Sequence, residues 1–455
     1  MPIIRLTVDS QGLQCIERLG GGSVESSTPR SDSTAYVVEP AEWFSDVHVE
    51  FKLGRARLRV PAKGFYIWDT PHPPPLHQCL VDPAYDPPSS RLTTIQTRTC
   101  TGITFFISST GSLSGIHAHT SIRPSAQETF ESLPRRQQNA VMWVYVPIRD
   151  EIAAFGISQP RSKAARASVV SQTQHVRLRL GGDVFVGPYH CKQPQRFLLT
   201  EQPLALIYEK LEYIPVSFIG IHSACHKAEQ ISLAPPFHAS PPFEKAYFSS
   251  APLGDVASIR IFNDREAQAC RGIVIQYVNG SQRALGQCRV GIDRDRIVMG
   301  PRRFCFASFT FGRSYSGEQL CAAKVESSTT HHEHDGTDWA CNELRGVLRF
   351  WFKNRQTKLE VSYMLTINRC CVISTVVAEN DWGCHHSLHR ACPPRLRAPR
   401  VSTSPSIREL TSLHASADEP TESERFCTGR ADENIVELVS VVMPFRPMLR
   451  QRPAS

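Results

Sequence analysis

The sequence predicts an all-β protein. Short apolar segments with alternating hydrophobicity recur along the chain, for example "HVRLRL" at 175–180 and "FCFASFTF" at 304–311. Turn residues separate such segments about every ten residues between 92 and 226, a spacing typical of sandwiches, barrels and prisms. The 33 prolines fall in clusters. Together these observations favour short strands and irregular loops over long helices.

Composition divides the chain into five parts. Residues 1–40, rich in Ser, Thr and Gly, predict a flexible N-terminus, and residues 41–75 predict a β-hairpin segment from "VHVEF", "ARLRV" and "FYIW". Residues 92–226 predict a β-rich domain, and residues 245–367 predict a second, degenerate β-rich region. Residues 393–455 are rich in Arg, Pro and Ser and predict a largely disordered basic tail.

A short pattern, Cys-x-Gly-Ile followed by a glycine turn, occurs at Cys100 and again at Cys270, in "CRGIVIQYVNGSQRALGQCRVG". In the second copy, Asn279-Gly280 predicts a type I′ hairpin turn because both residues tolerate positive φ. Alternation predicts that Ile273, Ile275 and Tyr277 share one face. The repeat suggests that a unit restarts within residues 245–367, either as a second domain or as extra strands of the first.

Four blocks between residues 92 and 226 carry a resemblance in their order and spacing. They are "GITFFISSTGSLSGIHAH", "VYVPIRDEIAAFGI", "VRLRLGGDVFVGPY" and "RFLLTEQPLALIYEKLEYIPVSFIGIHS". In this order they resemble a jacalin-type β-prism lectin domain. The segment around Cys270 also resembles a family of fungal proteins, a likeness that implies no activity.

The jacalin-type resemblance implies three four-stranded Greek-key sheets around a pseudo-threefold axis, and carbohydrate binding by loops at one end. The family's closing loop carries a Gly and, four residues later, an Asp that accepts sugar hydroxyls. About Tyr213 and Ser217 stand at these positions, so the acid is missing. Ligand binding would then depend on loop polar groups: Ser112, Ser114, Glu212, Tyr213 and Ser217. The alternative is a structural scaffold that binds no sugar.

Searches for catalytic and metal-binding patterns favour a protein that is not an enzyme. "GSLSG" at 111–115 has Leu113 where a nucleophile elbow needs serine, and no dinucleotide-binding glycine pattern lies between a strand and a helix. The tract around His331, His332, His334 and Asp335, and the tract "CHHSLHRAC" at 384–392, contain possible zinc ligands. Neither has a standard ligand spacing, so solvated histidines are expected, with no metal and no cofactor.

Charge and hydropathy bear on partners and location. The net charge of +8 arises partly from basic clusters at 161–166 and 395–400, which lack interleaved aromatics. We therefore expect no nucleic-acid partner, and a glycan or a protein remains a possible partner. No basic segment followed by a long apolar run begins the sequence, and no apolar run reaches the ~20 residues of a membrane span. These features predict a soluble, cytoplasmic protein with no membrane association and reduced cysteines; they leave the oligomeric state open.

Overall fold

The computed structural model describes residues between 2 and 376. The gaps in that range are 10–11, 21–32, 46, 53–54, 60–65, 82–90, 159–172, 190–194, 211–214, 217, 226, 234–239, 265–268, 314–316, 318, 331–332, 335–337, 355 and 368–369. The tail predicted at 393–455 lies outside the described residues.

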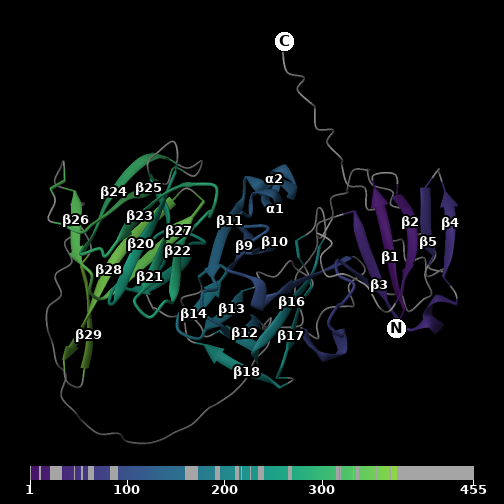
Figure 1. The fold of residues 1–455 in the computed structure, drawn as a ribbon. Helices are drawn as coiled ribbons and strands as arrows, with labels where there is room; N and C mark the ends of the chain where they lie inside the picture. Colours follow the sequence, from purple (N-terminus) through teal and green to yellow (C-terminus); the bar gives the residue numbers. More distant parts are fainter. Residues whose placement is uncertain are drawn as a thin grey trace, which may run out of the picture. The chain divides into compact units, whose positions relative to one another are not determined.

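The described residues form β-sheets with only short helices, so the predicted all-β class is confirmed (Figure 1). The helical turns are η1 (Ala41–Phe44), η2 (Leu76–Gln78), η3 (Thr97–Thr99), α1 (Gln127–Ser132) and α2 (Arg135–Gln138). The strands fall into two sets of three sheets, preceded by additional N-terminal strands.

The first sheet group runs from β7 to β18. One sheet contains the order β8-β16-β17-β7, the second is β10-β9-β11, and the third is β14-β13-β12-β15-β18. Their bounds are β7 (Cys79–Val81), β8 (Arg91–Gln96), β9 (Gly102–Ser108), β10 (Leu113–His119), β11 (Val141–Pro147), β12 (Ile152–Ser158), β13 (Gln174–Leu178), β14 (Gly182–Val186), β15 (Gln195–Glu201), β16 (Pro203–Glu209), β17 (Ile219–Ser223) and β18 (Ala228–Leu233).

The second sheet group runs from β19 to β29. Its sheets are β19-β27-β28-β29, β22-β21-β20-β23 and β25-β24-β26. Their bounds are β19 (Tyr247–Pro252), β20 (Val256–Asn263), β21 (Cys270–Tyr277), β22 (Gln282–Gly286), β23 (Arg294–Met299), β24 (Arg303–Arg313), β25 (Gln319–Ser328), β26 (Trp339–Glu343), β27 (Val347–Lys353), β28 (Gln356–Ile367) and β29 (Cys370–Val376).

Both groups contain the same kinds of sheet, but the three-stranded sheet precedes the Greek-key sheet in the first group and follows it in the second. In each group an early strand pairs with the first strand of a hairpin near the end of the group: β8 with β16, and β19 with β27. In between, strands β12–β15 and β20–β23 each place the fourth strand beside the first, which is the order of a Greek key. The three-stranded sheets β10-β9-β11 and β25-β24-β26 also return their last strand beside the first. The second group therefore forms sheets of its own and does not extend the sheets of the first.

The two copies of the Cys-x-Gly-Ile sequence pattern do not lie at equivalent strands of the two sheet groups. Cys100 precedes β9, the first strand of its sheet, whereas Cys270 begins β21, the second strand of a Greek key. In the sheet that contains Cys270, strand β20 precedes the pattern, whereas no strand of the β10-β9-β11 sheet precedes Cys100. The Cys-x-Gly-Ile pattern thus marks two hairpins at different places in the strand plan.

The hairpin turn at Asn279-Gly280 is not the predicted type I′. Gly280 has φ of 85°, but Asn279 is not among the described residues with positive φ. The Gly280 amide donates to the carbonyl of Tyr277 at 3.0 Å, and the Tyr277 amide donates to Ser281 at 2.9 Å. These bonds define a three-residue loop, a type I turn followed by a glycine in the left-handed region. The Asn279 side chain stabilises this loop because its Oδ1 atom accepts a hydrogen bond from the Ser281 amide at 3.0 Å.

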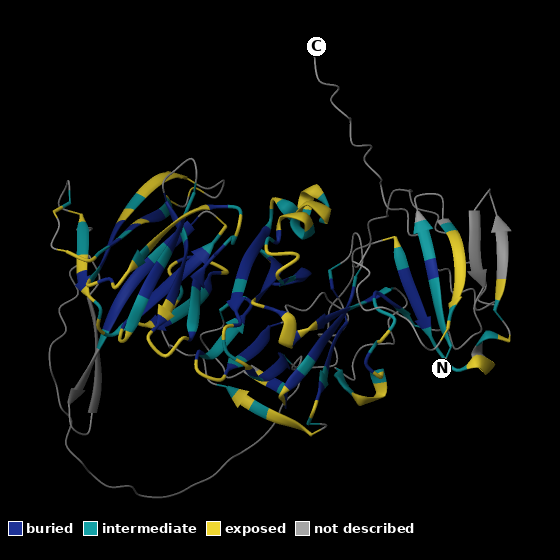
Figure 2. Ribbon diagram, viewed as in Figure 1, coloured by how far each residue is buried: buried dark blue, intermediate teal, exposed yellow. Residues whose placement is uncertain are grey.

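The alternation predicted for β21 is confirmed. Ile273, Ile275 and Tyr277 are buried in the main apolar cluster, whereas Val274 packs on the opposite face with Phe262. The main cluster includes residues of both sheet groups, and buried positions concentrate on their strands (Figure 2).

Hydrogen bonds also connect the two groups. Gln287 accepts from the Trp143 amide at 3.2 Å and donates to the Asn354 carbonyl at 2.6 Å. Arg283 in β22 donates to the Asp183 carbonyl in β14 at 3.0 Å. Because Gln287 is buried with both ends of its amide bonded, its position is tightly specified.

Residues 1–40 differ from the sequence expectation of a flexible N-terminus. Strands β1 (Ile3–Asp9), β2 (Gly12–Leu19) and β3 (Thr34–Val38) lie there. Through β6 (Ile67–Trp68), which pairs parallel with β8, they extend that sheet to eight strands. The overall Ser, Thr and Gly content of residues 1–40 does not reveal that apolar residues such as Leu6 and Val37 are buried in these strands. Within the segment predicted as a hairpin, β4 (His48–Lys52) pairs antiparallel with β5 (Arg55–Arg59).

The loop assignment at Gly280 leads to a stability prediction. No atom lies within 4 Å of a Cβ placed on Gly280 or on Gly254, but only Gly280 has positive φ. Gly280→Ala should therefore lower the free energy of unfolding by about 1–2 kcal/mol through backbone strain alone. Gly254→Ala is the matched control and should leave it nearly unchanged. Chemical denaturation of both variants measures this, and equal stability of the two would contradict the left-handed assignment.

Candidate functional site

The loops expected to bind a ligand meet at the turn between β9 and β10. The Val216 amide, in the connection before β17, donates to the Leu113 carbonyl at 2.7 Å. The Tyr247 hydroxyl from β19 donates to the Ser108 carbonyl at 2.8 Å. Two segments distant in sequence therefore bond to the turn at residues 108–112, which we call the 108–112 turn, or to Leu113 directly after it.

The 108–112 turn has the same loop geometry as the turn at Gly280. The Gly111 amide donates to Ser108 and the Ser108 amide donates to Ser112, both at 2.8 Å, and Gly111 has φ of 87°. A chain of hydroxyls lies on it: Ser108 Oγ is 2.7 Å from Thr110 Oγ1, which is 3.3 Å from Ser112 Oγ. The turn is thus held mainly by its own polar groups.

The structure places the predicted ligand-binding residues unevenly. Ser112 and Ser114 come together at the start of β10, but both are buried, with 5% and 6% of their surface exposed. Thr110 is the exposed hydroxyl of the turn. Glu212, Tyr213 and Ser217 lie outside the described residues, although the Val216 bond brings their connection to the turn. A ligand at this end would therefore meet Thr110 before either predicted serine.

A buried polar cluster lies on the β9–β10 hairpin behind the turn. His119 Nε2 is 2.7 Å from Thr104 Oγ1, and His119 Nδ1 is 2.8 Å from the Pro124 carbonyl. His117 Nδ1 is 2.8 Å from Thr129 Oγ1, and its Nε2 is 3.3 Å from the Arg123 carbonyl. Since a carbonyl can only accept, each imidazole donates one proton to it, and its other nitrogen is bonded to a threonine hydroxyl, which can donate or accept. This arrangement can accommodate neutral rings, each accepting from its threonine hydroxyl.

The pKa values of the pair agree with neutral rings. Burial, helped by the neighbouring His119, lowers the pKa of His117 to about 4, and burial lowers the pKa of His119 as well. Their rings pack edge to face, with centroids 4.8 Å apart. The two histidines anchor the segment of residues 123–129 to the sheet.

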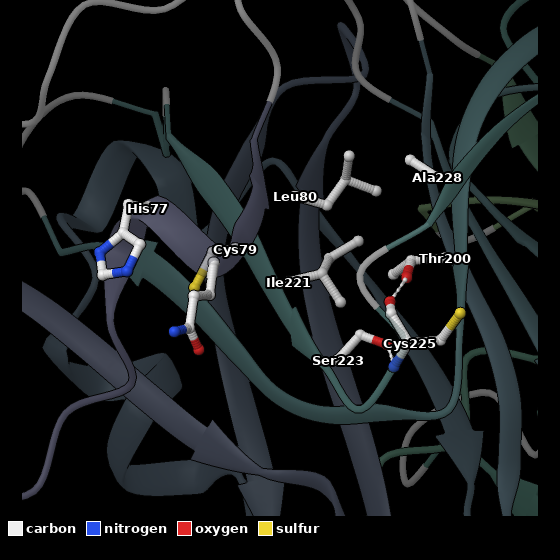
Figure 3. Close-up of a pocket in the computed structure, with 9 residues that line it drawn as sticks. His77, Cys79, Leu80, Thr200, Ile221, Ser223, Cys225 and Ala228 are labelled. Atoms are coloured by element: carbon white, nitrogen blue, oxygen red, sulfur yellow. Dashed lines mark hydrogen bonds between the residues drawn. The ribbon is translucent and has the colours of Figure 1, made fainter.

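A small pocket lies where the β7–β17 edge of one sheet meets β15 and β18 of another (Figure 3). Its volume is about 230 Å³, below the ~300 Å³ at which pockets for drug-sized ligands begin. The lining residues are His77, Gln78, Cys79, Leu80, Thr200, Ile221, Ser223, Cys225 and Ala228.

Several polar side chains of this pocket form hydrogen bonds with nearby backbone groups. Thr200 donates to the Cys225 carbonyl at 3.1 Å, and Ser223 accepts from the Cys225 amide at 3.0 Å; Figure 3 shows both bonds. The Cys79 thiol donates to the Pro75 carbonyl at 3.3 Å, and burial raises its pKa to about 12. A thiol so protonated is a poor nucleophile.

Four cysteines in or next to strands are buried. Cys100, Cys270, Cys288 and Cys305 are 7% exposed or less. Burial raises the pKa of the Cys270 and Cys288 thiols. Such thiols behave as small apolar groups.

Comparisons with known proteins return no matching family model, no similar curated protein and no similar solved structure. Across the described residues, no helix has the length and apolar character needed to cross a membrane. The candidate site therefore has to be interpreted from its own geometry.

The sequence analysis places Ser112 and Ser114 on this hairpin but does not identify the two histidines of its interior. His117 and His119 alternate with Ile116 and Ala118 along β10, a spacing that places both rings on one face. Their carbonyl partners at 123 and 124 follow only from the fold of the next segment.

The neutral histidines predict how stability depends on pH. The pKa of His117 is about 6.5 in an unfolded chain and about 4 in the folded protein, so the unfolded state binds more protons between these values. The free energy of unfolding should fall as pH drops from about 6.5 to 4, by up to about 3 kcal/mol from this residue. Denaturation curves across this range should show a flatter dependence for His117→Gln. An equal slope in both proteins would contradict the assignment.

Proposed function

We propose that the protein is a non-catalytic, lectin-like binding module built on two β-prism-like units. The observation that carries the proposal is a strand plan that occurs in both groups: an early strand paired with a late hairpin, with one Greek-key sheet and one three-stranded sheet between them. This plan is compatible with the three Greek-key sheets that the jacalin-type resemblance implies. Some sheets have three strands or five rather than four, so each unit departs from that pattern.

The ligand site of this proposal lies at the 108–112 turn and the connection before β17. Hydroxyl groups and backbone amides on adjoining loops can hydrogen-bond a sugar without any chemical step. Thr110 supplies an exposed hydroxyl, and the hydrogen bond between Val216 and Leu113 supports the adjacency of the two loops. Without the family's aspartate, binding would be weak and its specificity altered.

The alternative is a scaffold that binds a protein partner and no sugar. The burial of Ser112 and Ser114 favours this alternative, because both would have to become accessible before contacting a ligand. The twofold strand plan supports either function equally, since a rigid set of sheets can present loops to many kinds of partner.

Glycan-array screening of the full chain separates the two functions. Lectin activity predicts selective binding that Tyr213→Ala and Thr110→Ala weaken by about tenfold or more, roughly the loss of one or two hydrogen bonds. Ser232→Ala, at an exposed position on β18, is the matched control and should bind like the wild type. No binding to any glycan, or equal binding by all variants, would contradict a sugar site at these loops.

A further inference from the structure

Two cysteines and a glutamate form a row across the sheet β25-β24-β26. Cys305 in β24 lies opposite Cys341 in β26, and on its other side it lies opposite Glu326 in β25. Residues directly opposite each other in antiparallel strands project from the same face of the sheet. Cys305 is buried and Cys341 is exposed, so the row runs from the interior to the surface.

His334, in the connection between β25 and β26, lies against this row. Its ring stacks on Trp339 with centroids 4.1 Å apart and planes 5° from parallel. Its Nδ1 atom is 3.4 Å from a carboxylate oxygen of Glu326, and its side chain is only 7% exposed. Trp339 precedes Cys341 by two residues in β26, which places both side chains on one face.

The ligand atoms of Cys305, His334 and Cys341 all lie within 4.8 Å of one another. On a tetrahedral zinc ion, bond lengths of about 2.3 Å to sulfur and 2.0 Å to nitrogen put neighbouring ligand atoms about 3.5–3.8 Å apart. The three side chains therefore need to move together only slightly to share one ion. Cys341, at the surface, provides a path of entry.

We propose that Cys305, Cys341 and His334 bind a zinc ion, with Glu326 as the residue that positions His334. Two thiolates balance the charge of Zn²⁺, and one imidazole completes a Cys2His set in which water can take the fourth position. The imidazole binds through one nitrogen while the other faces the carboxylate, an arrangement common around metal-bound histidines. The ion would fasten the β25–β26 connection to the sheet.

This site differs from both zinc candidates that the sequence suggested. His334 belongs to the first of those tracts, but its partners come from β24 and β26 rather than from neighbouring histidines. His331, His332 and Asp335, and the tract 384–392, lie outside the described residues. The site stands independently of sugar binding, because it lies in the second sheet group and the proposed glycan loops lie in the first.

The test is metal binding by the full chain, reduced and stripped with a chelator, using Co²⁺ as a spectroscopic probe and Zn²⁺ as competitor. The wild type should develop a thiolate-to-cobalt charge-transfer band, which Zn²⁺ abolishes. Cys341→Ser and His334→Gln should each lower zinc stoichiometry by one equivalent, and Glu326→Gln should weaken binding by about 10–100-fold. Cys321→Ser, in β25 but outside the cluster, is the matched control and should bind like the wild type.

Differences between variants are the measurement, because other cysteines and histidines in the chain can also bind zinc. Cys341 is exposed, so Cys341→Ser removes no core packing and tests the site even if His334→Gln disturbs the stack on Trp339. Equal stoichiometry and affinity in the wild type, Cys341→Ser and His334→Gln would overturn the site. So would a loss in Cys321→Ser as large as that in Cys341→Ser.

Discussion

The fold depends on strand pairs that join the beginning of each sheet group to its end. In the first group Leu92 of β8 lies opposite Glu209 of β16, and in the second Tyr247 of β19 lies opposite Phe352 of β27. Strands β9–β15 of the first group and β20–β26 of the second lie between these points in the sequence. The pairs bury large side chains, including Leu92, Leu206, Tyr247 and Phe350. They also cover strand edges that would otherwise expose unpaired backbone groups.

A second constraint is the contact between the two groups. The side-chain amide of Gln287 connects the Trp143 amide to the Asn354 carbonyl, and Arg283 reaches Asp183 from the neighbouring strand set. Buried groups of this kind stabilise only one arrangement, since each unmade bond costs about 1–3 kcal/mol. The shared apolar cluster adds non-directional stabilisation, while the polar contacts specify the register between the groups.

Local patterns predicted strands well and long-range arrangement poorly. Alternation placed Ile273 and Ile275 on one face because the pleat of a strand alone determines that outcome. The turn at Asn279-Gly280 was assigned to the wrong type because Asn tolerates both signs of φ, and the side-chain bond to Ser281 decides between them. The repeat of Cys-x-Gly-Ile was real in the sequence but marks different strands in the two groups.

The same contrast between local patterns and long-range packing explains which residues of the two proposed sites the sequence could indicate. Ser112 and Ser114 were identified from the hairpin, but their burial depends on packing that no local pattern encodes. Cys305 and Cys341 could not be paired from the sequence, because the register of β24 with β26 brings them together. Both proposed sites use loops or strand positions supported by the twofold strand plan.

Hydrogen exchange of the full chain tests that plan most directly. If the first strands close their groups, peptides covering β8 and β19 should exchange as slowly as those covering β16 and β27, and each pair should lose protection together as denaturant is added. Rapid exchange in β8 or β19 while β16 and β27 stay protected would contradict the account.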